Sequence, residues 1–286
     1  MNVGIVGLGL IGGSLAKAVK SRTEHRVWGF DVLDTVLHKA KAEQVIDDVL
    51  MPERLEKCDL VLLALFPETT LEWLQKNSGS LRAGTIVVDC CGIKQEICRL
   101  GFELAQRHGF TFIGGHPMAG VERFGFEASK ADLFLNASMV LTPEIGINLE
   151  ALEQSKAFFL SLGFARITIS TPEEHDRVIA YTSQLAHLLS SAYIKSDTAF
   201  LHSGISAGSF QDMTRVATLQ PEMWGELFML NRDPLLQELD GLIDRLGEYR
   251  QAIATDQRAE LVRLLDEGRV KKAEVNKITA AGQSRK

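Results

Sequence analysis

The sequence predicts an α/β domain with a mostly parallel β-sheet, followed by an all-helical domain. Up to residue 171, short apolar or β-branched runs alternate with helical patterns, as happens when helices connect parallel strands and cover both faces of a sheet. From residue 172 onward there is almost no strand signal, and long amphipathic segments follow one another. We therefore expect two domains, 1–171 and 172–286.

Seven runs of the first domain have the composition of strands. They cover residues 2–9, 25–31, 60–66, 85–90, 110–115, 138–143 and 165–170, with helical patterns between the earlier ones. Four helical segments are expected in the second domain, at 173–198, 209–231, 233–255 and 257–275. In the third of these, Leu235, Leu239, Leu242 and Leu246 recur every three or four residues and form an apolar stripe. Small helical domains often cannot bury such a stripe alone, so a dimer is plausible.

Composition and charge narrow the class of protein. The 286 residues are 45% hydrophobic and 24% charged, as in ordinary folded proteins. A net charge of -6 argues against general nucleic-acid binding, which needs clustered Lys and Arg. The longest apolar run (60–66) is too short to span a bilayer, and no signal peptide is expected before the first strand. Because the four cysteines lack disulfide or zinc spacing, we expect a soluble cytoplasmic protein with reduced thiols and no metal.

A glycine pattern follows the first strand and opens a helix. In G-L-G-L-I-G, Gly7 permits a tight turn, Gly9 lets a pyrophosphate approach the backbone, and Gly12 lets helix and strand pack closely. Asp31, at the end of the next strand, can accept hydrogen bonds from a ribose hydroxyl, and its charge would repel a 2′-phosphate. The pattern predicts a Rossmann-type doubly wound domain that binds NAD rather than NADP. The alternative is a glycine-rich turn without a ligand.

Ligands of an open α/β sheet bind outside the carboxyl ends of its strands, where three further segments end. These are 63–68, 89–94 and "GGHPMAG" at 114–120. In the last one, Pro117 restricts the backbone of His116 and the glycines leave space for another molecule. Imidazole, with an ordinary pKa of about 6.5, accepts a proton near neutral pH, so we predict that His116 is catalytic rather than structural. The other predicted cofactor contacts are Leu10, Ile11, Ala64 and Pro67.

Two segments of the helical domain add candidates for substrate binding. Asp176, Ser183 and His187 are spaced by seven and four residues, which would place them on one face of a regular helix. Such a polar stripe lines a wet cavity, or it is simply a solvated outer face. Arg215, in segment 208–224, has a planar guanidinium that suits a fixed carboxylate, although a surface arginine is the simpler interpretation.

Together these segments resemble the prephenate (or arogenate) dehydrogenase family of tyrosine biosynthesis. The segments that carry the resemblance are "GLGLIGGSLA", "DCCGIK", "GGHPMAGVERFGFE", "EHDRVIAYTSQLAH" and "SFQDMTRVATLQPEMW". The histidine-centred segment and the D-x-T-R segment are specific, whereas the glycine pattern is not. The resemblance implies NAD-dependent oxidative decarboxylation of prephenate to 4-hydroxyphenylpyruvate, with arogenate to tyrosine as the closest variant. It also implies a homodimer formed through the helical domain.

The same resemblance implies roles for particular residues. His116 would accept a hydrogen bond from the ring hydroxyl of the substrate, Arg215 would bind a substrate carboxylate, and His187 would lie near the substrate side chain. The remaining predicted substrate contacts are Asp176, Gly208, Trp224, Val121 and Gly92.

The chain departs from the family pattern at three positions. Gly92 stands where many members carry a serine that assists the catalytic histidine, so a water or a backbone N–H would have to replace that hydroxyl. Val121 stands where some relatives have threonine, and Gln184 where others have histidine. The last two departures concern substrate preference rather than reaction class.

Two other functions compete with this one. A different NAD-dependent dehydrogenase of the same two-domain plan, such as a β-hydroxyacid dehydrogenase, usually carries a catalytic lysine on a helix after the first domain. Lys195 is the only lysine in segment 173–198, and no G-x-x-x-G frames it. A non-catalytic NAD-sensing or dimerisation module would have no reason to combine His116 with Arg215.

Overall fold

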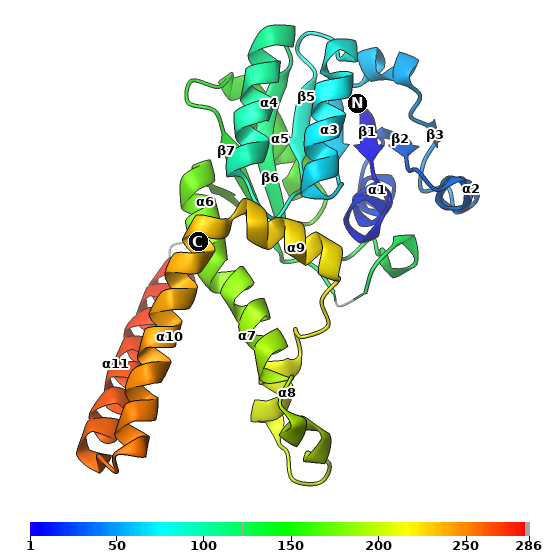
Figure 1. The fold of residues 1–286 in the computed structure, drawn as a ribbon. Coiled ribbons are helices and arrows are strands. Elements are labelled where there is room, and N and C mark those ends of the chain that lie inside the picture. Colours follow the sequence, from blue (N-terminus) through cyan, green and yellow to red (C-terminus); the bar gives the residue numbers. More distant parts are fainter. Residues whose placement is uncertain (122, 284–286) are drawn as a thin grey trace. The chain divides into compact units, whose positions relative to one another are not determined.

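The computed structural model describes residues 1–121 and 123–283, and the chain divides into two compact units (Figure 1). The first unit is Met1–Leu235 and the second is Leu236–Lys286. The predicted boundary after residue 171 marks a change from sheet to helices rather than a division between these units, and it stays a prediction.

One eight-stranded sheet forms the centre of the first unit, in the order β3-β2-β1-β4-β5-β6-β7-β8. Every neighbouring pair is parallel except β6 and β7, which are antiparallel, so the predicted mostly parallel sheet is confirmed. A two-residue strand, β3, lies at one edge and has too short a run to be predicted. The strands are β1 (Asn2–Val6), β2 (Arg26–Phe30), β3 (Asp48–Val49), β4 (Leu60–Leu63), β5 (Ile86–Asp89), β6 (Thr111–Met118), β7 (Ser138–Pro143) and β8 (Arg166–Ile169).

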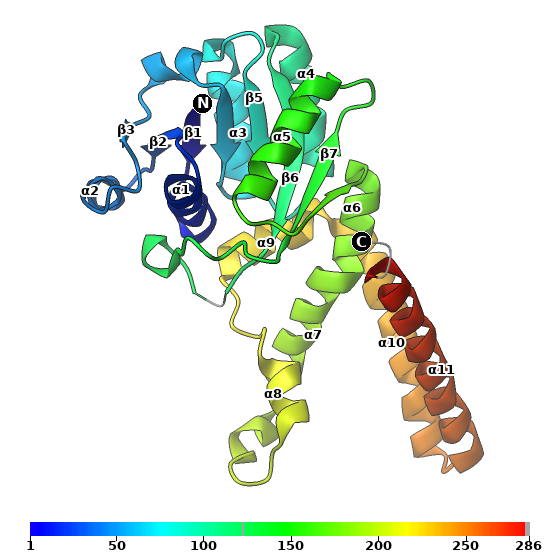
Figure 2. The ribbon, with the colours of Figure 1, turned by 180° about the vertical axis from the view of Figure 1, so that it is seen from behind.

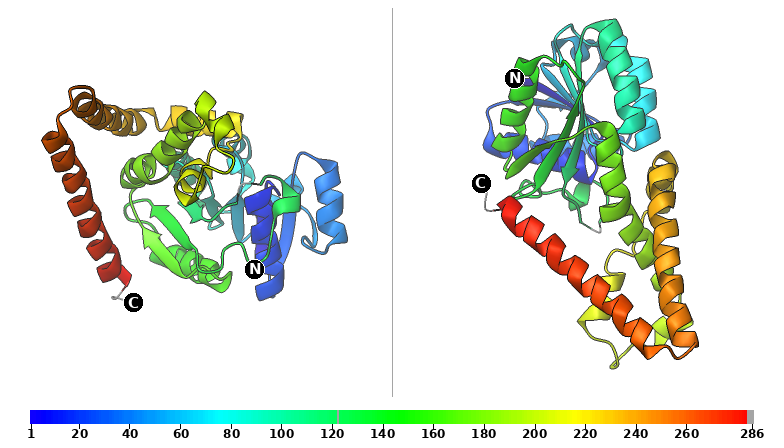
Figure 3. Two further views of the ribbon diagram at one scale, coloured as in Figure 1. Left: turned by 90° about the horizontal axis from the view of Figure 1, so that it is seen from below. Right: turned by 90° about the vertical axis from the view of Figure 1, so that its left-hand side faces the viewer.

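Helices cover both faces of this sheet, as the alternating pattern predicts. Figure 1 shows α3 (Pro67–Asn77) and α4 (Gln95–His108) in front of the strands, and Figure 2 shows α5 (Leu149–Ser161) in front from behind. The right-hand view of Figure 3 shows α4 and α5 on opposite sides of the sheet. Helices α1 (Leu10–Arg22) and α2 (Asp34–Ala42) bury Leu15 and Leu37 in the same core cluster as Phe159 of α5. Leu74 of α3 and Leu104 of α4 belong to the other cluster.

Strand β6 extends further than the sequence predicts. The expected strand ended at residue 115, whereas β6 continues to Met118 and His116 pairs with Val140 of β7. Strand β5 pairs with β6 only as far as Ile113. His116 therefore lies on a part of β6 that projects beyond the carboxyl end of β5 and is held by its antiparallel neighbour. This is the edge at which ligands of such sheets bind.

The helices after the sheet are more broken than predicted. The expected helix 173–198 consists of α6 (Pro172–Ile179), a π-helical turn (Ala180–Leu185) and α7 (Ala186–Tyr193). The π turn interrupts the 3.6-residue period on which the shared face of Asp176 and His187 was predicted. The expected helix 209–231 consists of α8 (Gly208–Thr214) and α9 (Pro221–Leu230). Proline starts α9 because its missing N–H is harmless there. Short 3-10 helices lie at Pro52–Lys57, Ser78–Ser80, Phe126–Ala128 and Asp197–Leu201.

The last two helices agree with the predicted segments 233–255 and 257–275, although the second is longer. They are α10 (Arg232–Ala254), which begins in the first unit, and α11 (Arg258–Gln283). Within the second unit, Tyr249 Oη donates to Leu264 O at 3.0 Å. Large apolar side chains remain exposed on both helices, among them Ile243, Leu246, Ile253, Val262, Leu265 and Ile278. Among the described residues, no helix is long and apolar enough to cross a membrane.

We predict that Gly114→Ala destabilises the protein. A Cβ at this position of β6 would overlap with the Thr142 hydroxyl and the Cys98 sulfur, both buried. Overpacking of this kind should lower the free energy of unfolding by about 1–3 kcal/mol, measured by urea denaturation. Gly120→Ala is the control, because a Cβ there has no heavy atom within 4 Å. Equal stability of the two variants would contradict the prediction.

Candidate active site

A chain of hydrogen bonds runs from His116 to a buried carboxylate. His116 Nδ1 lies 2.9 Å from His175 Nε2, and His175 Nδ1 lies 2.7 Å from Asp176 Oδ1. Because a carboxylate only accepts, His175 Nδ1–H donates to Asp176, and a neutral His175 then accepts at Nε2 from His116 Nδ1–H. This arrangement leaves His116 Nε2 without a proton and able to accept one.

The Asp176 carboxylate is anchored at the start of α4. Its Oδ1 accepts from the backbone N–H of Lys94 at 2.7 Å and its Oδ2 from that of Gln95 at 2.9 Å. A negative charge is favourable there, because the first N–H groups of a helix carry partial positive charge. The side chain is fully buried, and Asn231 Nδ2 donates to its backbone carbonyl at 2.9 Å. Asp176 thus anchors His175, and its predicted contact with a substrate stays a prediction.

Both histidines of this hydrogen-bond chain, His116 and His175, favour the neutral form. Burial lowers the pKa of His116 well below its ordinary value, and the neighbouring His175, with which it cannot easily share a second positive charge, and the Lys94 cation lower it further. Burial also lowers the pKa of His175, although its hydrogen bond to Asp176 opposes this shift. At neutral pH His116 is therefore an uncharged acceptor, as the tautomer argument requires.

Leu227 occupies the space beside Gly92. A Cβ at Gly92 would lie 3.2 Å from Leu227 Cδ2 and 3.9 Å from His116 Nε2. The position at which a serine was expected is thus next to the acceptor nitrogen, and an apolar side chain of α9 covers it. Leu227 is buried, and its carbonyl accepts from Gln184 Nε2 at 3.0 Å.

The other predicted substrate residues lie on α7, α8 and α9. His187 stacks on Trp224 with ring centroids 4.1 Å apart, and its Nδ1–H donates to Ser183 O at 2.8 Å. Gly208 starts α8 and Arg215 lies exposed at its end. Val121, which is 38% exposed, follows β6. The structure brings His187 and Trp224 together, and the roles of all these residues stay predictions.

The glycine turn fits a pyrophosphate. Gly7 has a φ of +84°, and a Cβ there would overlap with the Ala64 carbonyl. A Cβ at Gly12 would overlap with the Gly7 carbonyl, whereas one at Gly9 would meet nothing. Helix α1 begins after Gly9, which has no side chain to cap it, and the described first turn, Leu10 and Ile11 included, holds no acidic residue. The N–H groups of this turn are therefore available to an anion.

Asp31 is held in a fixed position next to this turn. Its Oδ2 accepts from Leu8 N at 2.8 Å and its Oδ1 from Leu33 N at 3.0 Å. Each carboxylate oxygen keeps a further lone pair for a ribose hydroxyl. Pro67 starts α3 at the same sheet edge. The residues present therefore fit NAD.

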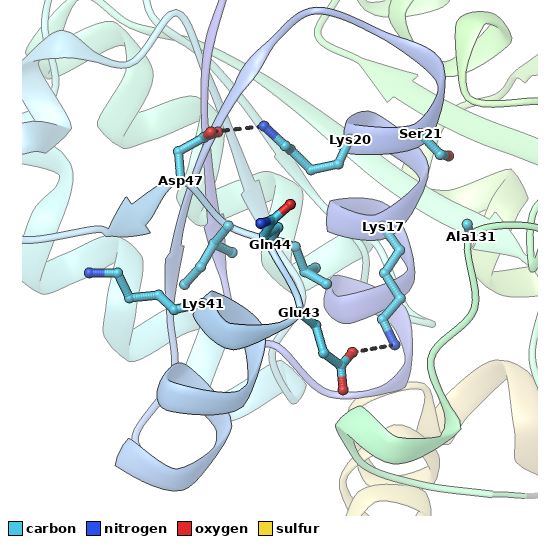
Figure 4. A pocket seen from close by; sticks show the side chains of 10 residues that line it. Lys17, Lys20, Ser21, Lys41, Glu43, Gln44, Asp47 and Ala131 are labelled. Carbon is cyan, nitrogen blue, oxygen red and sulfur yellow. Dashed lines mark hydrogen bonds and ion pairs between the residues drawn. The ribbon is translucent and has the colours of Figure 1, made fainter.

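An open surface pocket lies apart from these residues, between α1 and the segment after α2. Two of its lysines are paired with acids of the same pocket: Lys20 Nζ lies 2.8 Å from Asp47 Oδ1, and Lys17 Nζ lies 3.5 Å from Glu43 Oε2 (Figure 4). We assign no ligand to it. Within residues 1–121 and 123–283, no group of three or more His, Cys, Asp or Glu side chains is placed to hold a metal ion.

Fold and site together define a nicotinamide-dependent dehydrogenase, with a dinucleotide-binding turn and a neutral histidine at the same sheet edge. The family model for the nucleotide-binding domain of prephenate dehydrogenase matches residues 15–168, and that for its dimerization domain matches residues 171–267. The chain belongs to the prephenate dehydrogenase family, which confirms the resemblance inferred from the motifs.

Similar proteins agree with this assignment. The chain is 30% identical to a prephenate dehydrogenase of Bacillus subtilis, over 91% of this chain and 72% of that protein. It is 31% identical to a cyclohexadienyl dehydrogenase of Zymomonas mobilis, over 89% of both. Its fold is similar to that of Synechocystis arogenate dehydrogenase, with a TM-score of 0.80, 29% identity and coverage of 96% and 100%. A complex of A. aeolicus prephenate dehydrogenase with hydroxyphenyl propionate and NAD+ gives a TM-score of 0.82, 28% identity and coverage of 96% and 98%.

Sequence reasoning missed His175. The signal was present, because His175 and Asp176 are adjacent in the quoted segment "EHDRVIAYTSQLAH". Adjacent residues on a helix point in different directions, so that only the packing of α6 against β6 could show that His175 meets His116.

We predict that His175→Leu lowers kcat by about 10–100-fold with little change in KM for the substrate. The variant leaves His116 Nδ1–H without its acceptor, so the tautomer with a free Nε2 is no longer imposed. Steady-state kinetics measures both constants. His108→Leu, on the exposed end of α4, is the matched control and should keep native kinetics. A native kcat in His175→Leu would contradict the proposed hydrogen-bond chain.

We also predict that Asp31→Ser raises KM for NAD by about tenfold and lowers KM for NADP. The substitution replaces the carboxylate, a strong acceptor for the ribose hydroxyl, by a shorter and neutral hydroxyl, and it removes the charge that repels a 2′-phosphate. Initial rates with each cofactor provide the measurement. Asp34→Ser, at the exposed start of α2, is the control. An unaltered ratio of the two KM values would remove Asp31 from the cofactor site.

Proposed function

We propose that this chain catalyses the NAD-dependent oxidative decarboxylation of prephenate to 4-hydroxyphenylpyruvate, with arogenate to tyrosine as the closest variant. The observation that carries the proposal is the acceptor nitrogen of His116, held beyond the carboxyl end of β5 by His175 and Asp176. Membership of the prephenate dehydrogenase family supports the substrate class.

The reaction needs one side chain that accepts a proton near neutral pH. Prephenate is a cyclohexadienol with a carboxylate on the ring carbon opposite the hydroxyl. As hydride leaves the hydroxyl-bearing carbon, His116 Nε2 takes up the hydroxyl proton and the C–O bond gains double-bond character. The bond to the ring carboxylate then breaks, its electron pair enters the ring, and CO2 departs. Aromatisation provides the driving force, and the proton returns to the oxygen, so that the product is a phenol. When bound, NAD accepts the hydride.

The hydrogen-bond chain supports His116 in this role. As the imidazole takes up positive charge, its Nδ1–H donates more strongly to His175, and the Asp176 carboxylate stabilises the charge at the far end. A base positioned in this way contributes about 10²–10⁴-fold to the rate. Leu227 places an apolar side chain beside Gly92, next to the acceptor nitrogen.

We assign the substrate side to the helical part of the chain. Arg215 would bind a substrate carboxylate through its planar fork, and the stacked pair His187 and Trp224 would face the substrate side chain. Gly208, Val121, Gly92 and Asp176 would complete this side. We further propose that residues 1–171 bind NAD and that residues 172–286 bind substrate and form a homodimer. The match to the dimerization domain and the exposed apolar side chains of α10 and α11 support the homodimer. The expected cytoplasmic location and the absence of nucleic-acid binding remain part of this proposal.

Purified protein with NAD and prephenate should form NADH and 4-hydroxyphenylpyruvate, measured by absorbance and chromatography. Arogenate and NADP are tested in parallel, since side-chain preference depends on residues whose roles are still predictions. His116→Asn is the matched variant and should lower kcat far more than it raises KM. Lack of NADH formation with both substrates would overturn the proposed function.

A further inference from the structure

We propose that Lys94, through its buried ion pair with Asp89, is a positioning residue that fixes both ends of the His116–His175–Asp176 hydrogen-bond chain and places its cation beside the peptide unit that leads into His116. The proposal rests on the proposed function only in that it treats His116 as the proton acceptor.

Lys94 makes hydrogen bonds near both ends of the hydrogen-bond chain. The backbone N–H of Lys94 donates to Asp176 Oδ1, the oxygen that also accepts from His175 Nδ1. The Lys94 ammonium donates to the Gly115 carbonyl at 2.7 Å, in the peptide unit that joins Gly115 to His116. Lys94 thus sets the distance between the anchor on α6 and the histidine on β6.

Asp89 binds the other polar backbone group of Gly115, its N–H. Its Oδ1 accepts from Gly115 N at 3.1 Å, and its Oδ2 accepts from Cys91 N at 2.9 Å and from the Lys94 ammonium. Both polar groups of Gly115 are therefore held by one buried ion pair. A Cβ at Gly115 would overlap with the Asp89 carbonyl, so the backbones of β5 and β6 lie close together there.

The ion pair is fully buried, since both side chains have no exposed surface. A buried ion pair is weak evidence for stability, because apolar side chains of similar size often serve as well. The Lys94 ammonium and the Asp89 carboxylate both bind the backbone of Gly115, which directly precedes His116 in β6. A positioning role requires this placement.

The charges around the acceptor are few and can be named. Asp89 ends β5, Lys94 directly precedes α4, and His175 and Asp176 belong to α6. The nearby thiols of Cys91 and Cys98 are uncharged, because burial raises the pKa of each to about 12. Burial is the largest single influence on the pKa of Lys94 and would lower it, but the charge and the hydrogen bond of Asp89, with smaller contributions from its neighbours, raise the pKa on balance, so the cation persists. A cation disfavours a second positive charge on His116, which lowers the pKa of the imidazole.

The test measures the pKa of His116 in the full-length protein without ligands. Histidine labelled with ¹⁵N is titrated by NMR, and His116→Gln identifies the resonance. Lys94→Met should raise the pKa of His116 by about one unit, because a nearby positive charge is removed. The acid limb of kcat/KM, which reports protonation of the acceptor, should move to higher pH by the same amount. The kcat at the plateau should fall about tenfold or more as Gly115 loses its donor.

Lys94→Met leaves Asp89 buried without its cation, which is strongly destabilising and can prevent folding. The double variant Asp89→Asn/Lys94→Met replaces the pair by neutral side chains of similar size and keeps the test available. Because it removes one positive and one negative charge, it should raise the pKa of His116 less than Lys94→Met does, since Lys94 is the member of the pair that lowers that pKa. Lys156→Met, which removes one partly exposed cation from α5, is the matched control and should leave the pKa and the kinetics unchanged.

An unchanged pKa of His116 in the folded Lys94 variants would overturn the proposal, even if kcat falls, since a purely structural role predicts that combination. The NMR readout needs neither substrate nor NAD. Failure of this proposal is therefore distinct from failure of the proposed function, which the NADH assay tests.

Discussion

The site depends on the carboxylate of Asp176, a residue of α6 whose side chain binds the start of α4. It accepts two backbone N–H groups of that helix and one imidazole N–H, so it joins α4 to α6 and orients His175. A buried carboxylate without such partners would be costly. With them, it gives the helical segment after the sheet a defined position against the strand that carries His116.

The second constraint is the extension of β6 beyond β5. Antiparallel pairing with β7 lets the backbone continue as a strand where its parallel neighbour has ended. Gly114 and Gly115 make this possible, because side chains there would overlap with Thr142 and with the Asp89 backbone. His116 therefore belongs to a rigid strand rather than to a loop, and its ring direction is set by pleat and hydrogen bond together. A rigid support of this kind suits a group that must meet a reacting atom at a defined distance.

Much of the fold was predictable because it depends on local patterns. Parallel strands that are buried on both faces appear in the sequence as continuous apolar runs, and the helices between them appear as amphipathic segments with a helical period. Where local signals mislead, the cause is a longer-range partner. The π turn between α6 and α7 and the extension of β6 both arise where elements distant in sequence meet. The division of segment 209–231 into two helices was visible in Pro221 and could have been predicted.

The sequence by itself determined the nucleotide-binding turn, Asp31 and the candidate acceptor His116. Each of these depends on residue types at short spacing: glycines where a Cβ would collide, an acid at a strand end, and a histidine before proline. Only the tertiary structure decided that His175 supports the acceptor and that Lys94 reaches both ends of the hydrogen-bond chain. The reason is geometric. Residues 94, 116 and 175 lie in three different parts of the fold. No local spacing in the sequence predicts which of their side chains meet when a strand and two helices pack together.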